Sequence, residues 1–81
     1  MHRIYFDTND GPDNIRYGLW FDKSLEDLAR VPGGPQPGMM VTIYMTGEVE
    51  MEATLEWAVQ SQAWTARPIE GTLRDNHDSW D

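Results

Sequence analysis

The chain has 81 residues, of which 40% are hydrophobic and 25% are charged, and it contains no cysteine. A chain of this length forms one domain with a small core, because it buries only about 60–65% of the surface that its unfolded form exposes. The lack of cysteine excludes disulfides, thiolate metal sites and a cysteine nucleophile. No window approaches the roughly 20 apolar residues of a membrane span, and we expect a cytoplasmic protein without a membrane partner.

Fourteen acidic residues against six basic residues give a formal net charge of −8. Such a field repels the phosphate backbone of nucleic acids. The six cations are dispersed singly along the chain: Arg3, Arg16, Lys23, Arg30, Arg67 and Arg74. Without a basic cluster interleaved with aromatic residues, we expect no nucleic-acid partner.

The first third of the chain predicts two short strands. Residues 3–7 are β-branched and aromatic and precede a run of turn-forming residues at 8–14, whereas residues 15–22 alternate apolar and polar side chains. Gly18 within the second strand has no side chain to pack. It therefore suggests a bend, a bulge or a close approach by the ring of Trp20 or by neighbouring backbone.

Residues 24–31 carry the one helical pattern. Ser24 is a candidate N-cap, and the acidic residues that follow it, including Asp27, lie in the first turn, where the helix dipole favours negative charge. Pro32 ends the helix. Residues 32–38 are prolines, glycines and one glutamine, and they predict a connecting loop.

A hairpin follows the loop. Its strands are residues 39–46 and residues 48–57, and the second alternates polar and apolar residues for ten positions, with a period that only a half-buried strand explains. A two-residue turn would pair Met45 with Glu48, and a three-residue connection would pair Met45 with Val49. We favour the second register, because it keeps the apolar faces together.

The last part of the chain predicts one further strand over residues 63–69, and Pro68 makes it an edge or ends it there. Residues 72–74 form a last short strand. Residues 75–81 are polar and acidic and predict a flexible tail. We therefore expect one domain over residues 1–74.

Together these elements predict a mostly β fold, with five to six short strands and one short helix. The expected architecture is a small, strongly bent antiparallel sheet or an SH3-like barrel. Over residues 38–70, the order of a proline-glycine loop, a tight hairpin and a long strand followed by a tryptophan-containing strand resembles the central meander of such a barrel. An open α+β sheet with the helix on one face is the alternative.

Four glutamates share the polar face of the long strand: Glu48, Glu50, Glu52 and Glu56. Neighbours two apart stand about 6.5–7 Å from each other, too far to share a divalent ion without help from another strand. The core is also too small for the deep cleft of a glycosidase. We expect a solvated face or a protein-binding surface, with Arg67 and Arg16 opposite it as cross-strand partners, and no metal, cofactor or catalytic site.

Four tryptophans and three tyrosines are more aromatic surface than so small a core can hide. Trp57 and Trp64 fall on apolar faces of adjacent strands and are predicted to pack together in the core. Trp20, Tyr44 and Trp80 fall outside these faces, and we expect them to be exposed, as aromatic residues of binding surfaces are. Packing of Trp20 under the helix or the following loop is the alternative.

Two hypotheses about function follow. The first is a non-enzymatic interaction module, or a self-associating domain, that binds a protein partner or another copy of itself through Trp20, Tyr44 and the glutamate face. The alternative is an acidic inhibitor or immunity-type protein that blocks a basic partner through the face from Glu48 to Glu56. Neither hypothesis involves an enzyme or a cofactor.

Overall fold

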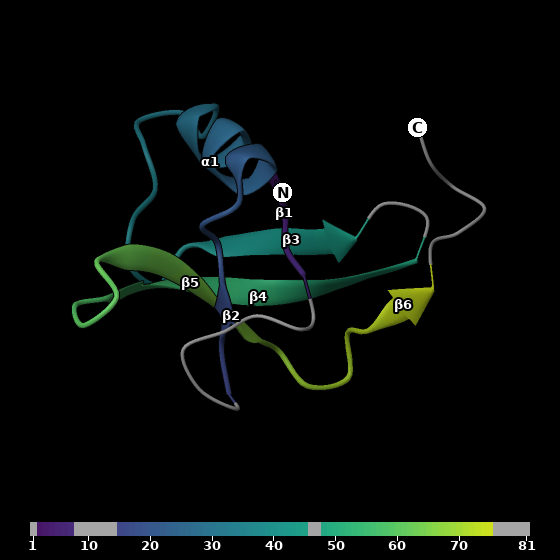
Figure 1. The fold of residues 1–81 in the computed structure, drawn as a ribbon. Coiled ribbons are helices and arrows are strands. Elements are labelled where there is room, and N and C mark those ends of the chain that lie inside the picture. Colours follow the sequence, from purple (N-terminus) through teal and green to yellow (C-terminus); the bar gives the residue numbers. More distant parts are fainter. Residues whose placement is uncertain (1, 8–14, 46–47, 76–81) are drawn as a thin grey trace.

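The computed structural model describes residues 2–7, 15–45 and 48–75, and only the backbone of Asp75. These residues form six strands and one helix: β1 (Arg3–Tyr5), β2 (Tyr17–Gly18), α1 (Asp22–Ala29), β3 (Met40–Met45), β4 (Val49–Ala58), β5 (Ala63–Pro68) and β6 (Arg74–Asp75). The strands lie in one sheet in the order β1-β3-β4-β5-β2, and β6 pairs with the start of β4. The sheet curls into a half-barrel with α1 on one side (Figure 1), which confirms the predicted small, bent β sheet with one short helix.

One pairing departs from the expected antiparallel order. β1 runs parallel to β3, with Tyr5 opposite Tyr44, whereas the other four pairings are antiparallel. Parallel neighbours need a long crossover connection, and here the chain between them passes through β2 and α1. The local pattern of the first strand carries no information about this direction.

The hairpin of β3 and β4 has the register that the hydrophobic pattern favours. Met45 pairs with Val49, as expected for a three-residue connection. Along β4, Met51, Ala53 and Leu55 are buried, so the predicted apolar face is confirmed. Trp57 continues this face but is 45% exposed, which shows that the core ends before the strand does.

The core draws on α1, β1, β3, β4 and β5, together with the chain that follows β1, β2 and α1. Its buried members are Ile4, Phe6, Leu19, Leu28, Val31, Val41, Ile43, Met51, Ala53, Leu55 and Ala66. The two ends of the sheet, β1 and β2, approach each other here, because the rings of Phe6 and Tyr17 lie 4.9 Å apart. Among the described strands, side-chain packing therefore links the two edges.

The N-cap of the helix lies three residues earlier than predicted. Phe21 occupies the N-cap position without a side-chain capping bond, and Asp22 supplies the negative charge of the first turn. The predicted N-cap role of Ser24 was wrong. Its side chain is fully buried, and its hydroxyl donates a hydrogen bond to the carbonyl of Tyr5 at 2.6 Å. Within the described residues, no helix is long and apolar enough to cross a membrane.

Asp27 is the second contact between α1 and β1. Its side chain is buried, and Oδ2 accepts hydrogen bonds from the backbone N–H of Tyr5 at 3.0 Å and from the hydroxyl of Tyr44 at 3.0 Å. With Ser24, it satisfies both backbone groups of Tyr5 that point away from β3. The helix therefore covers the outer edge of β1, an edge that otherwise invites pairing with other chains.

The remaining predicted boundaries differ in detail. The second strand is only two residues long, because the chain turns into α1 directly after it. β5 agrees with the strand predicted over residues 63–69. β6 includes residue 75, where the flexible tail was expected to begin. The predicted loop over residues 8–14 and the rest of the tail lie outside the described residues.

We expect Asp27→Asn to lower the free energy of unfolding by about 1.5–3 kcal/mol, because the charged acceptor of two hydrogen bonds is replaced by a neutral group of the same shape. Urea unfolding followed by circular dichroism measures this change. Glu26→Gln is the control, an exposed neighbour on the same helix whose effect should stay within about 0.5 kcal/mol. Equal effects of the two substitutions would contradict the role given to Asp27.

Candidate binding site

The glutamates of β4 are paired with arginines. Arg67 on β5 forms a bidentate pair with Glu56, with 3.2 Å between Nη2 and Oε1, and Arg16 approaches the same carboxylate at 3.5 Å. Both arginines lie where the sequence analysis expected them. Exposed pairs of this kind contribute less than about 1 kcal/mol each, so their main effect is on the charge of the surface.

The start of β4 is paired in the same way. Arg74 on β6 contacts Glu50 at 2.7 Å and Glu52 at 3.5 Å, and Arg3 on β1 contacts Glu50 at 3.2 Å. Four arginines therefore contact the three glutamates of β4, and the exposed Glu48 directly precedes the strand; these eight charges cancel. The other ten acidic and two basic residues of the chain carry the whole net charge of −8. This face is a mixed-charge surface.

Tyr44 is not exposed, and the expectation that it is was wrong. Only 7% of it is accessible, since β1 and α1 cover this face of β3. The guanidinium of Arg3 lies over its ring at 5.0 Å, and the ring of Tyr5 meets it edge-on at 5.9 Å. Burial, and next to it the hydrogen bond to Asp27, raise the pKa of Tyr44. Tyr44 therefore holds the helix to the sheet.

Trp57 and Trp64 face each other across β4 and β5. Their rings meet in a T-shaped contact with centroids 5.4 Å apart, which confirms that they pack together. Trp64 is half-buried against the core, whereas Trp57 projects past it. The prediction that Trp57 lies in the core was therefore wrong, because this end of β4 extends past the core.

Trp20 lies flat against Gly18, two residues before it. A Cβ added at Gly18 would overlap the six-membered ring of Trp20, so only glycine at this position permits the contact. This confirms the predicted close approach. Trp20 is half-buried, and its contact with the backbone of its own segment fixes it beside the end of β2.

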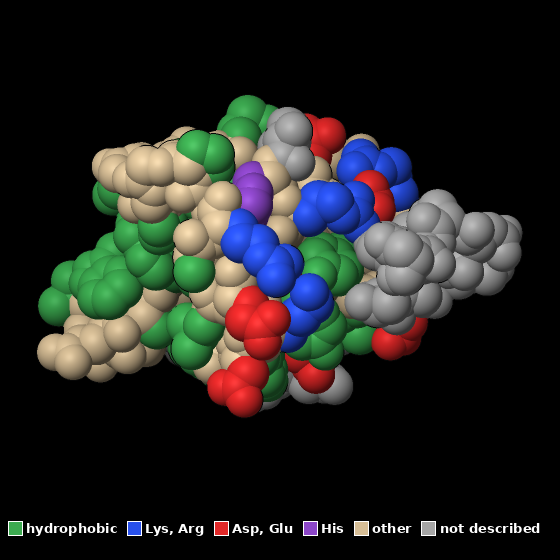
Figure 2. Space-filling model, turned by 90° about the horizontal axis from the view of Figure 1, so that it is seen from above, with side chains coloured by type: hydrophobic (Ala, Val, Ile, Leu, Met, Phe, Trp, Pro, Cys, Tyr) green, Lys and Arg blue, Asp and Glu red, His purple; other side chains and the backbone are tan. Residues whose placement is uncertain are grey.

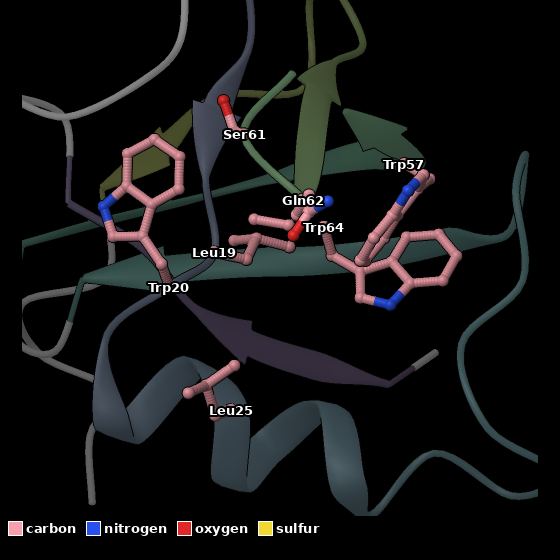
Figure 3. A pocket seen from close by; sticks show the side chains of 8 residues that line it. Leu19, Trp20, Leu25, Trp57, Ser61, Gln62 and Trp64 are labelled. Carbon is pink, nitrogen blue, oxygen red and sulfur yellow. The ribbon is translucent and has the colours of Figure 1, made fainter. Parts of the chain in front are cut away.

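The three tryptophans meet at one cleft of about 590 Å³, within the range of about 300–1,000 Å³ typical of ligand pockets. We call it the tryptophan cleft, and its lining residues are Leu19, Trp20, Leu25, Trp57, Ser61, Gln62, Ala63 and Trp64. Figure 3 shows Trp20 on one side of Leu19, the Trp57 and Trp64 pair on the other side, and Leu25 below them on α1.

The cleft brings together three segments that are separate in the sequence. The end of β2, the middle of α1 and the connection of β4 with β5 each supply part of its wall. The space-filling view shows the same division of the surface, with apolar side chains gathered at the end of the molecule that carries this connection, and basic and acidic side chains interspersed elsewhere (Figure 2). Sequence periodicity placed Trp57 in the core and so missed the cleft.

Within the described part of the chain, no cluster of three or more histidine, aspartate or glutamate residues has the geometry to hold a metal ion. The arrangement is suited to binding, because its surfaces are aromatic and apolar. Comparison with models of protein families, with curated proteins and with solved structures found no match to this chain. The geometry of the cleft is therefore the basis for a functional proposal.

The raised pKa of Tyr44 predicts a loss of stability at alkaline pH. The unfolded tyrosine ionises near pH 10.0, and the folded group ionises above this value. The stability that protonated Tyr44 contributes is fully present below pH 10.0 and is lost as the pH rises through the folded pKa. In urea unfolding at a series of pH values from about 9 to 11, we expect wild type to lose more stability than Tyr44→Phe. Parallel pH profiles of wild type and Tyr44→Phe would contradict this prediction. Tyr17→Phe is the control, and its pH profile should follow that of wild type.

Proposed function

We propose that the protein is a non-enzymatic interaction module that binds a partner protein, or a second copy of itself, through the tryptophan cleft. The observation that supports this proposal most is the convergence of Trp20, Trp57 and Trp64 on one open surface. Tryptophan is the residue most enriched among interface hot spots, because it contributes a large, rigid contact area. Within the described residues, none of the three tryptophans is fully buried, so part of each ring surface stays accessible to a partner.

The exposed area favours binding energetically. Trp57 is 45% exposed and Leu25 is 53% exposed, both beside the cleft. Removing roughly 100 Å² of Trp57 from water would contribute about 2.5 kcal/mol. Leu19 beneath them is fully buried and belongs to the core, so the floor of the cleft is rigid. A rigid apolar surface loses little entropy when a partner binds.

The glutamate face supports the alternative hypothesis less well. A polyanion that blocks a basic enzyme needs carboxylates without cations, whereas Glu50, Glu52 and Glu56 each lie against at least one arginine. Of the partner-binding residues expected from the sequence, Trp20 lines the cleft and Tyr44 does not. We propose the glutamate face as a solvated surface that is outside the binding site.

The location of the protein and the classes of partner that it avoids stay predictions. A cytoplasmic location fits the cysteine-free sequence, and the net charge of −8 supports a protein rather than a nucleic acid as partner.

Substitution of the cleft tryptophans tests the proposal. We expect Trp57→Ala and Trp20→Ala to weaken association at least about tenfold, since loss of a hot-spot tryptophan costs about 2 kcal/mol or more. Gly18→Ala should do the same without removing an aromatic residue, because the new Cβ displaces the ring of Trp20. The measurements are capture of partners from lysate, with bound proteins identified by mass, and light scattering for self-association.

Leu73→Ala is the matched control, since Leu73 is 64% exposed and does not line the cleft. Circular dichroism checks that each variant is folded. If folded Trp20→Ala and Trp57→Ala retain every association of the wild type, the tryptophan cleft is not the binding surface.

A further inference from the structure

We propose that the occupant of the tryptophan cleft is a basic segment of a partner protein, whose arginine or lysine side chains lie against the tryptophan rings. This inference rests on the proposed function and names the chemistry of the partner. Three observations carry it, namely the acidic residues beside the cleft on α1, the pairing of every cation of the chain, and the tryptophan walls.

The face of α1 next to the cleft is acidic. Residues of a helix follow each other at about 100°, so Asp22 is about 60° and Glu26 about 100° around the helix from Leu25, which lines the cleft. Both carboxylates are exposed. Within the described residues, neither makes an ion pair. A basic group entering the cleft therefore meets two carboxylates that lack a cation.

The cation of α1, Lys23, and the cation at its C-cap, Arg30, lie on the side of the helix away from Leu25. Lys23 approaches Asp27 at 3.5 Å and Arg30 approaches it at 3.8 Å, on the side where the helix contacts β1. By the same helical spacing, Lys23 lies about 160° and Arg30 about 140° around the axis from Leu25, so both cations lie farther from the cleft side of the helix than Asp22 and Glu26 do. This asymmetry makes the cleft side of α1 attractive to cations and repulsive to anions.

The other four cations also form ion pairs within the chain. Arg3, Arg16, Arg67 and Arg74 contact the glutamates of β4, so all six basic residues of the chain lie in ion pairs. In a second copy of the chain, every basic side chain is already in an ion pair, so none is free to pair with Asp22 and Glu26 beside the cleft. The net charge of −8 also opposes the approach of two copies. A basic segment of another protein fits these charges, and a second copy does not.

The walls of the cleft suit a cationic side chain. Tryptophan is the aromatic residue that attracts cations most strongly through the face of its ring, and the planar guanidinium of arginine also stacks on it. The stem of an arginine or lysine packs along apolar surface while its charged end reaches polar groups. Ser61 and Gln62 at the turn supply side-chain oxygens that accept hydrogen bonds from such an end.

A library of short random peptides displayed on phage tests this inference on the intact protein. Wild-type protein selects the peptides, and binding to the folded double variant Trp20→Ala/Trp57→Ala removes those that use other surfaces. We expect the remaining peptides to be enriched in arginine and lysine over the starting library. A synthetic copy of a selected peptide should bind wild type at least about tenfold more tightly than the double variant. Replacing its arginines by citrulline, which is neutral and has the same shape, should cause a similar loss.

The carboxylates of α1 are tested separately with the same peptide. We expect Asp22→Asn/Glu26→Gln to weaken binding about threefold to thirtyfold at low salt, with a smaller difference above about 0.15 M salt. Glu70→Gln is the control and should change binding less than about 1.5-fold. Glu70 is exposed and lies far from the cleft. Its neighbour Ile69 donates a backbone hydrogen bond to Glu52 of β4. Glu52 is five residues, or about 16 Å, along β4 from Trp57.

The outcomes separate this inference from the proposed function. Enrichment of neutral or acidic peptides that depend on the tryptophans, or unchanged binding by the Asp22→Asn/Glu26→Gln variant, would overturn the basic occupant and leave the tryptophan cleft as the binding surface. If no enriched peptide depends on Trp20 and Trp57, the inference fails. The lysate capture with the single tryptophan variants then decides the proposed function independently.

Discussion

Two side chains of α1 hold the edge of the sheet, and the rest of the structure depends on them. The hydroxyl of Ser24 donates to the carbonyl of Tyr5, and the carboxylate of Asp27 accepts the amide of Tyr5 and the hydroxyl of Tyr44. Two of these bonds satisfy the backbone groups of Tyr5 on the outer edge of β1 without another strand. A half-barrel that stays open can therefore avoid the pairing with other chains to which open sheet edges are prone.

The same contact determines where the binding surface lies. With Ser24 and Asp27 fixed on β1, Leu28 faces the core and Leu25 reaches the edge of the cleft. Lys23 and Arg30 contact Asp27, whereas Asp22 and Glu26 lie nearer to Leu25 and make no ion pair within the described residues. One buried carboxylate thus organises the attachment of the helix and the distribution of charge around it.

Local patterns predicted the features that depend on neighbours in the sequence. The ten-residue alternation gave the faces of β4, the apolar face selected the register of Met45 with Val49, and the absence of a side chain at Gly18 indicated the approach of Trp20. The cross-strand position of Arg67 also followed from the strand order. Each of these depends on period-two geometry within adjacent strands.

Features that depend on where α1 packs were not predictable in this way. Ser24 has the residue type of an N-cap, but burial against β1 gave its hydroxyl a different acceptor. Tyr44 alternates to the outer face of β3, yet the crossover that places β1 in parallel brings Asp27 over it. The cleft combines residues from three distant segments, and no sequence pattern encodes that meeting.

The central claim is that the tryptophan cleft, and not the glutamate face, contacts the partner. The most direct measurement is the change of nitrogen-15 and proton chemical shifts of the protein as a captured partner or selected peptide is added. We predict that the indole signals of Trp20, Trp57 and Trp64 shift together, while the amides of Glu50 and Glu52 stay in place. Shifts confined to the amides of Glu50 and Glu52, with unchanged indole signals, would contradict the claim.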